Sequence, residues 1–184
     1  MNKIFTIALI ALLFTVGACS PSADNKATDE KTMTDPKVYD EDINPIEQID
    51  QALAAANTQG KFVMCQVGGN WCPWCLRFAK FITDDADISK LVSDNFEYIH
   101  VNYNPRSSAS EEKTAQAKEM LARLGNPRRF GFPVFVVLDG EGNVLHIQDS
   151  SFLEEGKGYN KEKVMRFFNA WTPKAVAGHS DDGH

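Results

Sequence analysis

The chain has 184 residues, of which 43% are hydrophobic and 24% are charged, and its formal net charge is −6. That length and composition are ordinary for one globular domain with appended segments. The acidic balance, with no dense run of Lys and Arg, lacks the electrostatic footprint of a nucleic-acid-binding protein, so no nucleic acid partner is expected.

Residues 1–18 have the pattern of an export signal. A cationic start, Met1–Lys3, precedes an apolar run over 4–16 that is too short to span a bilayer comfortably. The run ends in Val16-Gly17-Ala18-Cys19, which resembles the bacterial lipobox, where the cysteine becomes lipidated. We therefore expect a lipoprotein signal peptide and a membrane anchor at Cys19. An ordinary signal peptide with a chance cysteine and an uncleaved anchor are the alternatives.

Export would place the remaining cysteines where disulfides form and persist. Ser20 after the cysteine resembles the pattern of lipoproteins that are sorted to an outer membrane. We therefore expect the protein to be anchored on the periplasmic side of a bacterial membrane, with the outer membrane favoured. A soluble periplasmic protein is the alternative. Residues 19–43 are rich in Ser, Asp, Lys, Thr and Pro, and we expect them to form a flexible tether.

The folded domain is expected over 44–173. Asn44-Pro45-Ile46-Glu47 offers an N-cap, a proline at the first helical position and a capping-box acid for a helix that stops at Gly60. Lys61–Val67 is short, apolar and partly β-branched, which predicts a buried strand. Gly68-Gly69-Asn70 breaks that strand before the cysteine motif.

Cys72 and Cys75 lie at the junction between this turn and the next helix, with two residues between them. The spacing makes a small reversible ring. At a helix N-terminus the free backbone N–H groups and the macrodipole stabilise a thiolate, so we expect Cys72 to attack substrate disulfides. Cys75, one turn further in, would resolve the mixed disulfide. An inert disulfide and half of a zinc site are the alternatives.

A structural zinc site would need a second pair of ligands at close spacing, and none is visible. The four histidines are isolated or lie in the tail, so we expect no metal and no cofactor. Of the four cysteines, the lipobox takes Cys19, and the odd number left favours one redox pair with one buried thiol. Cys65 lies within the apolar strand and is expected to act as a small hydrophobe.

The later elements continue the alternation of helices and strands. A helix capped by Ser108 with Glu111 should run to about Leu124, and residues 174–184 read as a loose tail. The other predicted elements are a short helix over 87–92, a strand over 96–103, a hairpin of 134–138 with 144–148, and a last helix from Asn160. The order predicts an α/β fold in which a mixed central sheet is flanked by helices on both sides.

The strand over 62–69, Trp71-Cys72-Pro73-Trp74-Cys75, and Gly131-Phe132-Pro133 before an apolar strand resemble the thioredoxin superfamily. The details are similar to bacterial thiol:disulfide interchange proteins of the DsbD type. The resemblance implies a thioredoxin-like three-layer sandwich. It also implies that Pro133 follows a cis bond, packs against the redox pair and leaves the backbone of Phe132 free to pair with a substrate peptide. Trp71 and Trp74 would form an apolar collar that receives partner side chains.

Two departures from the superfamily pattern stand out. Thioredoxins have a buried Asp six residues before the first cysteine, where this chain has Gln66, which can hydrogen-bond but cannot titrate. The proton of Cys75 must therefore leave by another route. The segment 104–112 lengthens a connection and is expected to be a surface loop near one edge.

The expected function is thus a thiol-disulfide oxidoreductase that reduces or isomerises disulfides of exported proteins and exchanges electrons with an unidentified redox partner protein. The direction depends on the reduction potential, which the motif does not set. The alternatives are a binding or delivery protein for a soft metal such as copper, and a non-catalytic scaffold.

Overall fold

The structure, a computed structural model, describes residues 37–105 and 110–181. Its helices are α1 (Pro45–Gln59), α2 (Pro73–Asp84), α3 (Ala86–Asn95), α4 (Glu111–Arg123), α5 (Lys161–Ala170) and α6 (Pro173–Asp181). Its main strands are β1 (Phe62–Gly68), β2 (Phe96–Asn102), β3 (Val134–Leu138) and β4 (Val144–Asp149). Shorter pieces are the 3₁₀ turns η1 (Pro127–Phe130) and η2 (Ser150–Leu153) and the strands β5 (Glu154–Glu155) and β6 (Gly158–Tyr159).

The ends of α1 follow from its capping residues, as the sequence predicts. The side chain of Asn44 accepts a hydrogen bond from the backbone N–H of Ile46, and Pro45 occupies the first turn, where its missing N–H is not needed. Gly60 ends the helix at a φ of 65°, a left-handed conformation that glycine adopts without a steric penalty. The chain then turns directly into β1.

The main sheet has the strand order β2-β1-β3-β4, with β1 and β2 parallel and the other pairs antiparallel. Met64 in β1 pairs with Tyr98 of β2 on one side and with Val137 of β3 on the other. Because β1 is central and covered on both faces, its side chains are almost all buried, which explains the unbroken apolar run.

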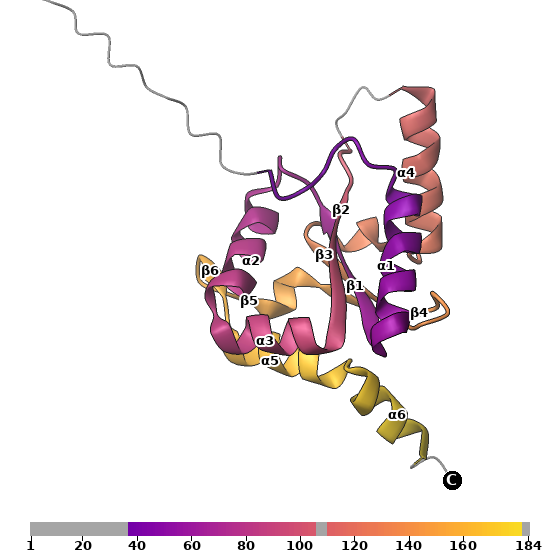
Figure 1. Ribbon diagram of the computed structural model, residues 1–184. Helices are drawn as coiled ribbons and strands as arrows, with labels where there is room; N and C mark the ends of the chain where they lie inside the picture. The colour runs from indigo at the N-terminus through magenta and orange to yellow at the C-terminus, as the bar shows by residue number, and fades with distance from the viewer. Residues whose placement is uncertain (1–36, 106–109, 182–184) are drawn as a thin grey trace, which may run out of the picture. The chain divides into compact units, whose positions relative to one another are not determined.

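Helices cover both faces of the sheet, and the alternation of side chains along the strands builds two cores. Figure 1 shows α1 and α4 on one side of the sheet and α2, α3 and α5 on the other. Val63, Cys65 and Val67 point toward the first group, whereas Met64 points toward the second. The predicted α/β three-layer sandwich with a mixed central sheet is therefore confirmed.

The structure corrects the sequence-based boundaries in three places. The N-cap of α4 is Ser110, whose side chain accepts from the N–H of Lys113, and not Ser108, which lies outside the described residues. The expected loose tail contains α6, whose start is capped by the Thr172 hydroxyl. The expected tether ends earlier than residue 43, because Tyr39 is fully buried in the domain.

No helix in the described part of the chain is long and apolar enough to cross a membrane. The predicted signal peptide, Cys19 and the tether up to residue 36 lie outside the described residues, as do 106–109 of the predicted surface loop.

Candidate active site

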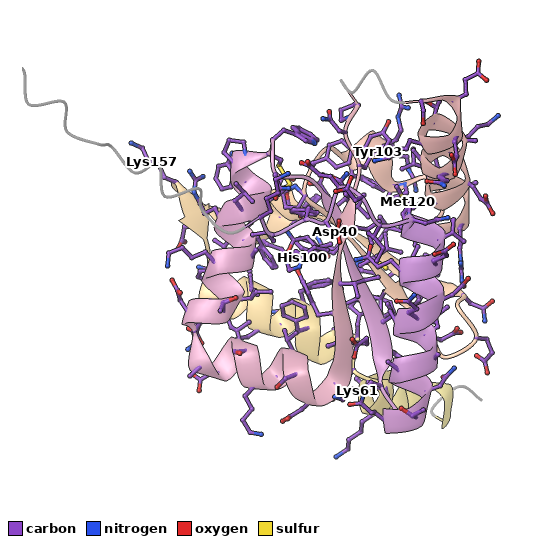
Figure 2. The ribbon with its side chains drawn as sticks, turned by 45° about the horizontal axis from the view of Figure 1, so that its top comes forward. Asp40, Lys61, His100, Tyr103, Met120 and Lys157 are labelled. Carbon is purple, nitrogen blue, oxygen red and sulfur yellow. A yellow bond between two sulfur atoms is a disulfide. The ribbon has the colours of Figure 1, made fainter. Side chains whose placement is uncertain are left out.

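Cys72 and Cys75 form a disulfide at the N-terminus of α2, with their Cα atoms 5.2 Å apart. Cys72 is the N-cap residue, in an extended conformation, and Pro73 occupies the first turn. The yellow bond in Figure 2 marks this disulfide. The strand β1 and its Gly-Gly turn therefore deliver the pair to the end of the helix where the sequence analysis expected it.

The two sulfurs have different surroundings. Cys72 retains 4% of its surface exposed, whereas Cys75 is completely buried. The backbone N–H of Cys75 donates a hydrogen bond of 3.2 Å to the sulfur of Cys72. The same sulfur lies 3.7 Å from the carbonyl oxygen of Phe132. Cys72 is thus the sulfur that faces both the helix N-terminus and the opening of the site.

The segment before β3 completes the site from the other side. The Phe132–Pro133 bond is cis, as the superfamily resemblance implies, and Pro133 is buried. Antiparallel pairing of Val67 with Val134 places this segment beside the end of β1, next to the turn that leads to the disulfide. Phe132 is half-buried and presents its ring to Trp71, at 5.6 Å between the ring centres.

Both tryptophans of the motif lie at the site, each half-buried. Trp71 donates a hydrogen bond of 3.0 Å from Nε1 to the carbonyl of Tyr103, which fixes its ring against Phe132. Trp74 packs edge-on against the ring of Tyr159 and carries the guanidinium of Arg77 over its face at 4.5 Å. The pair forms an apolar rim around the sulfurs, with one cation above it.

Beneath the disulfide, Gln66 is fully buried and uses its whole amide. Its Nε2 donates to the backbone carbonyl of Cys75 at 2.9 Å and to the hydroxyl of Tyr39 at 2.6 Å. Its Oε1 accepts from the hydroxyl of Tyr98 at 2.6 Å. The amide thus links Cys75 to two tyrosines. All of its polar atoms are hydrogen-bonded, in a buried place where an unpaired polar group would be costly.

Tyr39 reaches this network from the segment that precedes α1, and Asn70 holds that segment. Asn70 Oδ1 accepts from the backbone N–H groups of Val38 and Tyr39, at 3.1 and 3.0 Å. Its Nδ2 donates to the carbonyl of Tyr39 at 2.8 Å and to the carboxylate of Glu41 at 3.1 Å. We call residues 37–41 the strap, because they are tied to the turn directly before Trp71.

The strap lies within the segment predicted to be a tether, although the sequence contains a signal for it. Tyr39 is the only aromatic residue between positions 20 and 43, and it follows Val38 in a stretch that is otherwise mostly polar. The sequence places Asn70 in a strand-breaking turn and does not indicate that it holds the strap. A lone aromatic residue in a polar segment is the feature that would have pointed to a docking residue.

His100, labelled in Figure 2, lies on β2, and the centre of its ring is 5.2 Å from that of Tyr39 and 5.3 Å from that of Tyr98. Its Nε2 is buried and has no hydrogen-bond partner among the described residues. Burial therefore lowers the pKa of His100 to about 4, which keeps the ring neutral at neutral pH. No cluster of three or more His, Cys, Asp or Glu side chains that could hold a metal ion is found within 37–105 and 110–181.

Cys65 is a free and completely buried thiol in the core between β1 and the helices α1 and α4. Desolvation raises its pKa to about 12, so it stays protonated and unreactive in the folded chain. The expectation that Cys65 packs as a small hydrophobe is confirmed.

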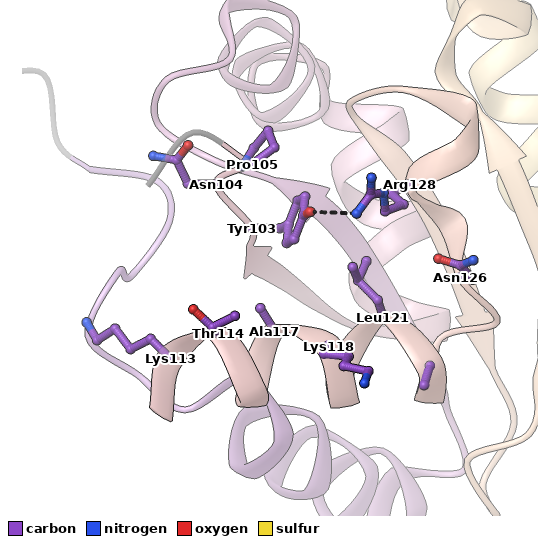
Figure 3. Close-up of a pocket in the computed structure, with 11 residues that line it drawn as sticks. Tyr103, Asn104, Pro105, Lys113, Thr114, Ala117, Lys118, Leu121, Asn126 and Arg128 are labelled. Carbon is purple, nitrogen blue, oxygen red and sulfur yellow. Dashed lines mark hydrogen bonds between the residues drawn. The ribbon is translucent and has the colours of Figure 1, made fainter. Parts of the chain in front are cut away.

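A hollow of about 700 Å³ adjoins the site and does not cover the disulfide. Figure 3 shows it between α4 and the end of β2, with Tyr103 and Arg128 on its inner wall. Arg128 donates to the hydroxyl of Tyr103 at 3.4 Å, and Lys113 and Lys118 line the hollow from α4. Tyr103 therefore lines this hollow and also accepts the hydrogen bond from Trp71 at the rim of the redox site.

A sequence profile described as thioredoxin-like matches residues 44–140, more than half of the chain. The chain belongs to the thioredoxin-like family. This thioredoxin-like chain is 27% identical, over 103 residues and 56% of its length, to the thiol:disulfide interchange protein DsbD of Colwellia psychrerythraea strain 34H. The match spans 15% of that longer protein.

Among solved structures, the disulphide isomerase from Xylella fastidiosa Temecula1 superposes with a TM-score of 0.59. Its sequence is 23% identical, and the match covers 71% of the thioredoxin-like chain and 93% of the isomerase. This likeness shows that the two proteins share the thioredoxin-like fold.

Proposed function

We propose that the chain is an exported thiol-disulfide oxidoreductase that reduces or isomerises disulfides of exported proteins by cycling Cys72 and Cys75 between dithiol and disulfide. One observation carries the proposal. The Cys72–Cys75 disulfide lies at a helix N-terminus, where Cys72 keeps a small exposed surface and Cys75 is completely buried. Membership of the thioredoxin-like family and the interchange activity named for the Colwellia relative support the same chemistry.

The reductive cycle follows from the two environments. Free N–H groups and the macrodipole of α2 stabilise the thiolate of Cys72, which attacks one sulfur of a substrate disulfide and releases the other as a thiolate. Cys75 then attacks Cys72, which frees the second substrate thiol and leaves the Cys72–Cys75 disulfide. Two electrons pass to the substrate in each cycle, so a redox partner protein must restore the dithiol. In isomerisation the released substrate thiol attacks again before Cys75 resolves.

Trp71, Trp74, Phe132 and Pro133 are proposed to bind the substrate around the sulfur of Cys72. The half-buried rings offer apolar surface to side chains that flank a substrate disulfide. The carbonyl of Phe132, 3.7 Å from that sulfur, is placed to pair with the backbone of an extended substrate peptide.

We infer further that the chain is exported to the periplasmic side of a bacterial membrane and anchored there by a lipid on Cys19, with the outer membrane favoured. The sequence of residues 1–20 supports this location. Labelled lipid should appear on the wild-type chain and be absent from Cys19→Ala, and an unlabelled, soluble wild type would refute the anchor.

The proposed activity is tested by insulin reduction with dithiothreitol as the electron source. Wild type should turn over, whereas Cys72→Ser should fall to the uncatalysed rate, because no thiolate remains to attack the substrate. Cys75→Ser should accumulate a mixed disulfide through Cys72, which identifies substrates directly by mass spectrometry. Cys65→Ser is the matched control, since this thiol is buried away from the pair, and it should keep full activity. Full activity in Cys72→Ser, or stoichiometric Cu(I) binding without turnover, would overturn the proposal.

A further inference from the structure

We propose that Tyr39 is a positioning residue for the resolving step, in which its hydroxyl donates a hydrogen bond to the thiolate of Cys75. The inference rests on the proposed dithiol-disulfide cycle and assigns part of the work of the missing buried acid to a residue outside the family-profile match. Three observations support it. The Gln66 amide orients the Tyr39 hydroxyl, the space beside Gly68 brings that hydroxyl near the sulfur of Cys75, and the strap holds Tyr39 in place.

The orientation of the Gln66 amide determines where the Tyr39 hydrogen points. The backbone carbonyl of Cys75 can only accept, so the group facing it must be the Nε2 of Gln66. The same Nε2 faces the hydroxyl of Tyr39, which must therefore accept from it. The hydroxyl hydrogen of Tyr39 remains for another acceptor, and none is assigned to it among the described residues.

The sulfur of Cys75 borders the same small space as this hydroxyl. A Cβ atom added to Gly68 would collide with the sulfur of Cys75 and would lie 3.0 Å from the oxygen of Tyr39. Tyr39, Cys72 and Cys75 also form one buried cluster, against which the hydrophobic side chains of Val38, Trp71, Trp74, Leu76 and Phe132 pack. The charged side chain described at this rim is Arg77, over the ring of Trp74. In these apolar surroundings a single donor has a large effect on a thiolate.

Tyr39 acts as a donor and not as a base. Burial raises its pKa far above the usual value for a phenol, so the hydroxyl keeps its proton throughout the cycle. Tyr98 also stays protonated for the same reason, and His100 is neutral at neutral pH. Neither Tyr98 nor His100 therefore carries a charge at neutral pH.

The step balances without any further reactant. Cys75 loses its proton to solvent water, and the resulting thiolate accepts the Tyr39 hydrogen bond. Its electron pair forms the bond to the sulfur of Cys72, while the bond between Cys72 and the substrate sulfur breaks and its electron pair leaves on the substrate thiolate, which takes up a proton from water. Tyr39 ends the step unchanged.

The test separates the two chemical steps with an aromatic disulfide reagent that releases a coloured thiolate. The first release reports attack by Cys72, and the second reports resolution by Cys75. In the full-length chain, Tyr39→Phe should leave the first step within about twofold of wild type and slow the second about tenfold, the effect of losing one hydrogen bond to a charged group. The pH midpoint of the second step should rise by about one unit.

Tyr159→Phe is the matched control, because it removes another largely buried hydroxyl, one that donates to the carbonyl of Trp74. It should change neither step nor either pH midpoint. Asn70→Ala, which releases the strap while keeping the phenol, should slow the second step in the same direction as Tyr39→Phe. The ultraviolet absorbance of the Cys75 thiolate, titrated in a Cys72→Ala background, should give the same upward shift for Tyr39→Phe.

An unchanged second step and an unchanged Cys75 midpoint in Tyr39→Phe would overturn the role of Tyr39, with wild type still releasing both thiolates. The same loss in Tyr159→Phe would also overturn it, because the effect would then be general destabilisation. Absence of any second release in wild type would instead overturn the proposed function.

Discussion

Gly68 ends β1 at the point where Cys75 packs against the sheet. Its missing side chain leaves room for the sulfur of Cys75, and the Tyr39 hydroxyl enters the same space. Strand interiors disfavour glycine, so this glycine serves close approach between the strand and the redox helix. A single methyl group is therefore the smallest change that should disturb the site.

We expect Gly68→Ala to lower the free energy of unfolding by about 1–3 kcal/mol, because the new Cβ must push the sulfur or the strand aside. The midpoint of urea unfolding measures this. Gly158→Ala is the control, since a Cβ there has nothing within 4 Å and its midpoint should stay near that of wild type. Equal midpoints for the two variants would contradict the crowding at Gly68.

At the scale of the elements, a helix or strand could be predicted where its own residues contain capping, terminating or hydrophobic patterns. The helix α1 has an N-cap, a proline and a terminating glycine, and β1 has a continuous apolar run, so both were predicted nearly to the residue. The strap was not predicted, because one buried tyrosine in a polar segment has no periodicity. Its docking depends on Asn70, which is distant in sequence.

The candidate site divides in the same way. The pair Cys72 and Cys75 could be placed from spacing and from the turn before α2, and the cis bond at Pro133 from the superfamily resemblance. The partners of Gln66 could not be found from sequence, because Tyr39 and Tyr98 meet it only through the sheet and the strap. The helix α6 was missed because its residues are small and polar, so it has a weak apolar face.

The cap of the helix α6 can be tested by mutation. The hydroxyl of Thr172 accepts from the backbone N–H of Ala175 at 3.1 Å, and Thr172 itself is buried. Thr172→Ala should speed amide hydrogen exchange over 175–178 and cost about 1 kcal/mol or less in global stability. Thr172→Ser keeps the hydroxyl and should retain protection. Unchanged exchange in Thr172→Ala would show that packing alone holds α6.

On the scale of the whole molecule, His100 connects stability to pH. Its folded pKa of about 4 lies below the value of about 6.5 for an exposed histidine, so the unfolded chain binds a proton first as the pH falls. The contribution of neutral His100 is fully present above pH ~6.5, is lost progressively down to pH ~4 and then stays constant. It amounts to at most about 3 kcal/mol.

His100→Gln should therefore flatten the dependence of unfolding free energy on pH between ~4 and ~6.5, as measured by urea unfolding at a series of pH values. An equal slope for wild type and His100→Gln would contradict the buried neutral imidazole.

The strap also has a mechanical consequence. Among the described residues, the backbone N–H groups of Val38 and Tyr39 are held by Asn70, directly before the redox motif. Tension applied through the preceding residues would therefore reach both the turn before Cys72 and Gln66 of β1. If those residues are tethered to a surface, a force on the tether would act on the side of the fold that carries the Cys72–Cys75 disulfide.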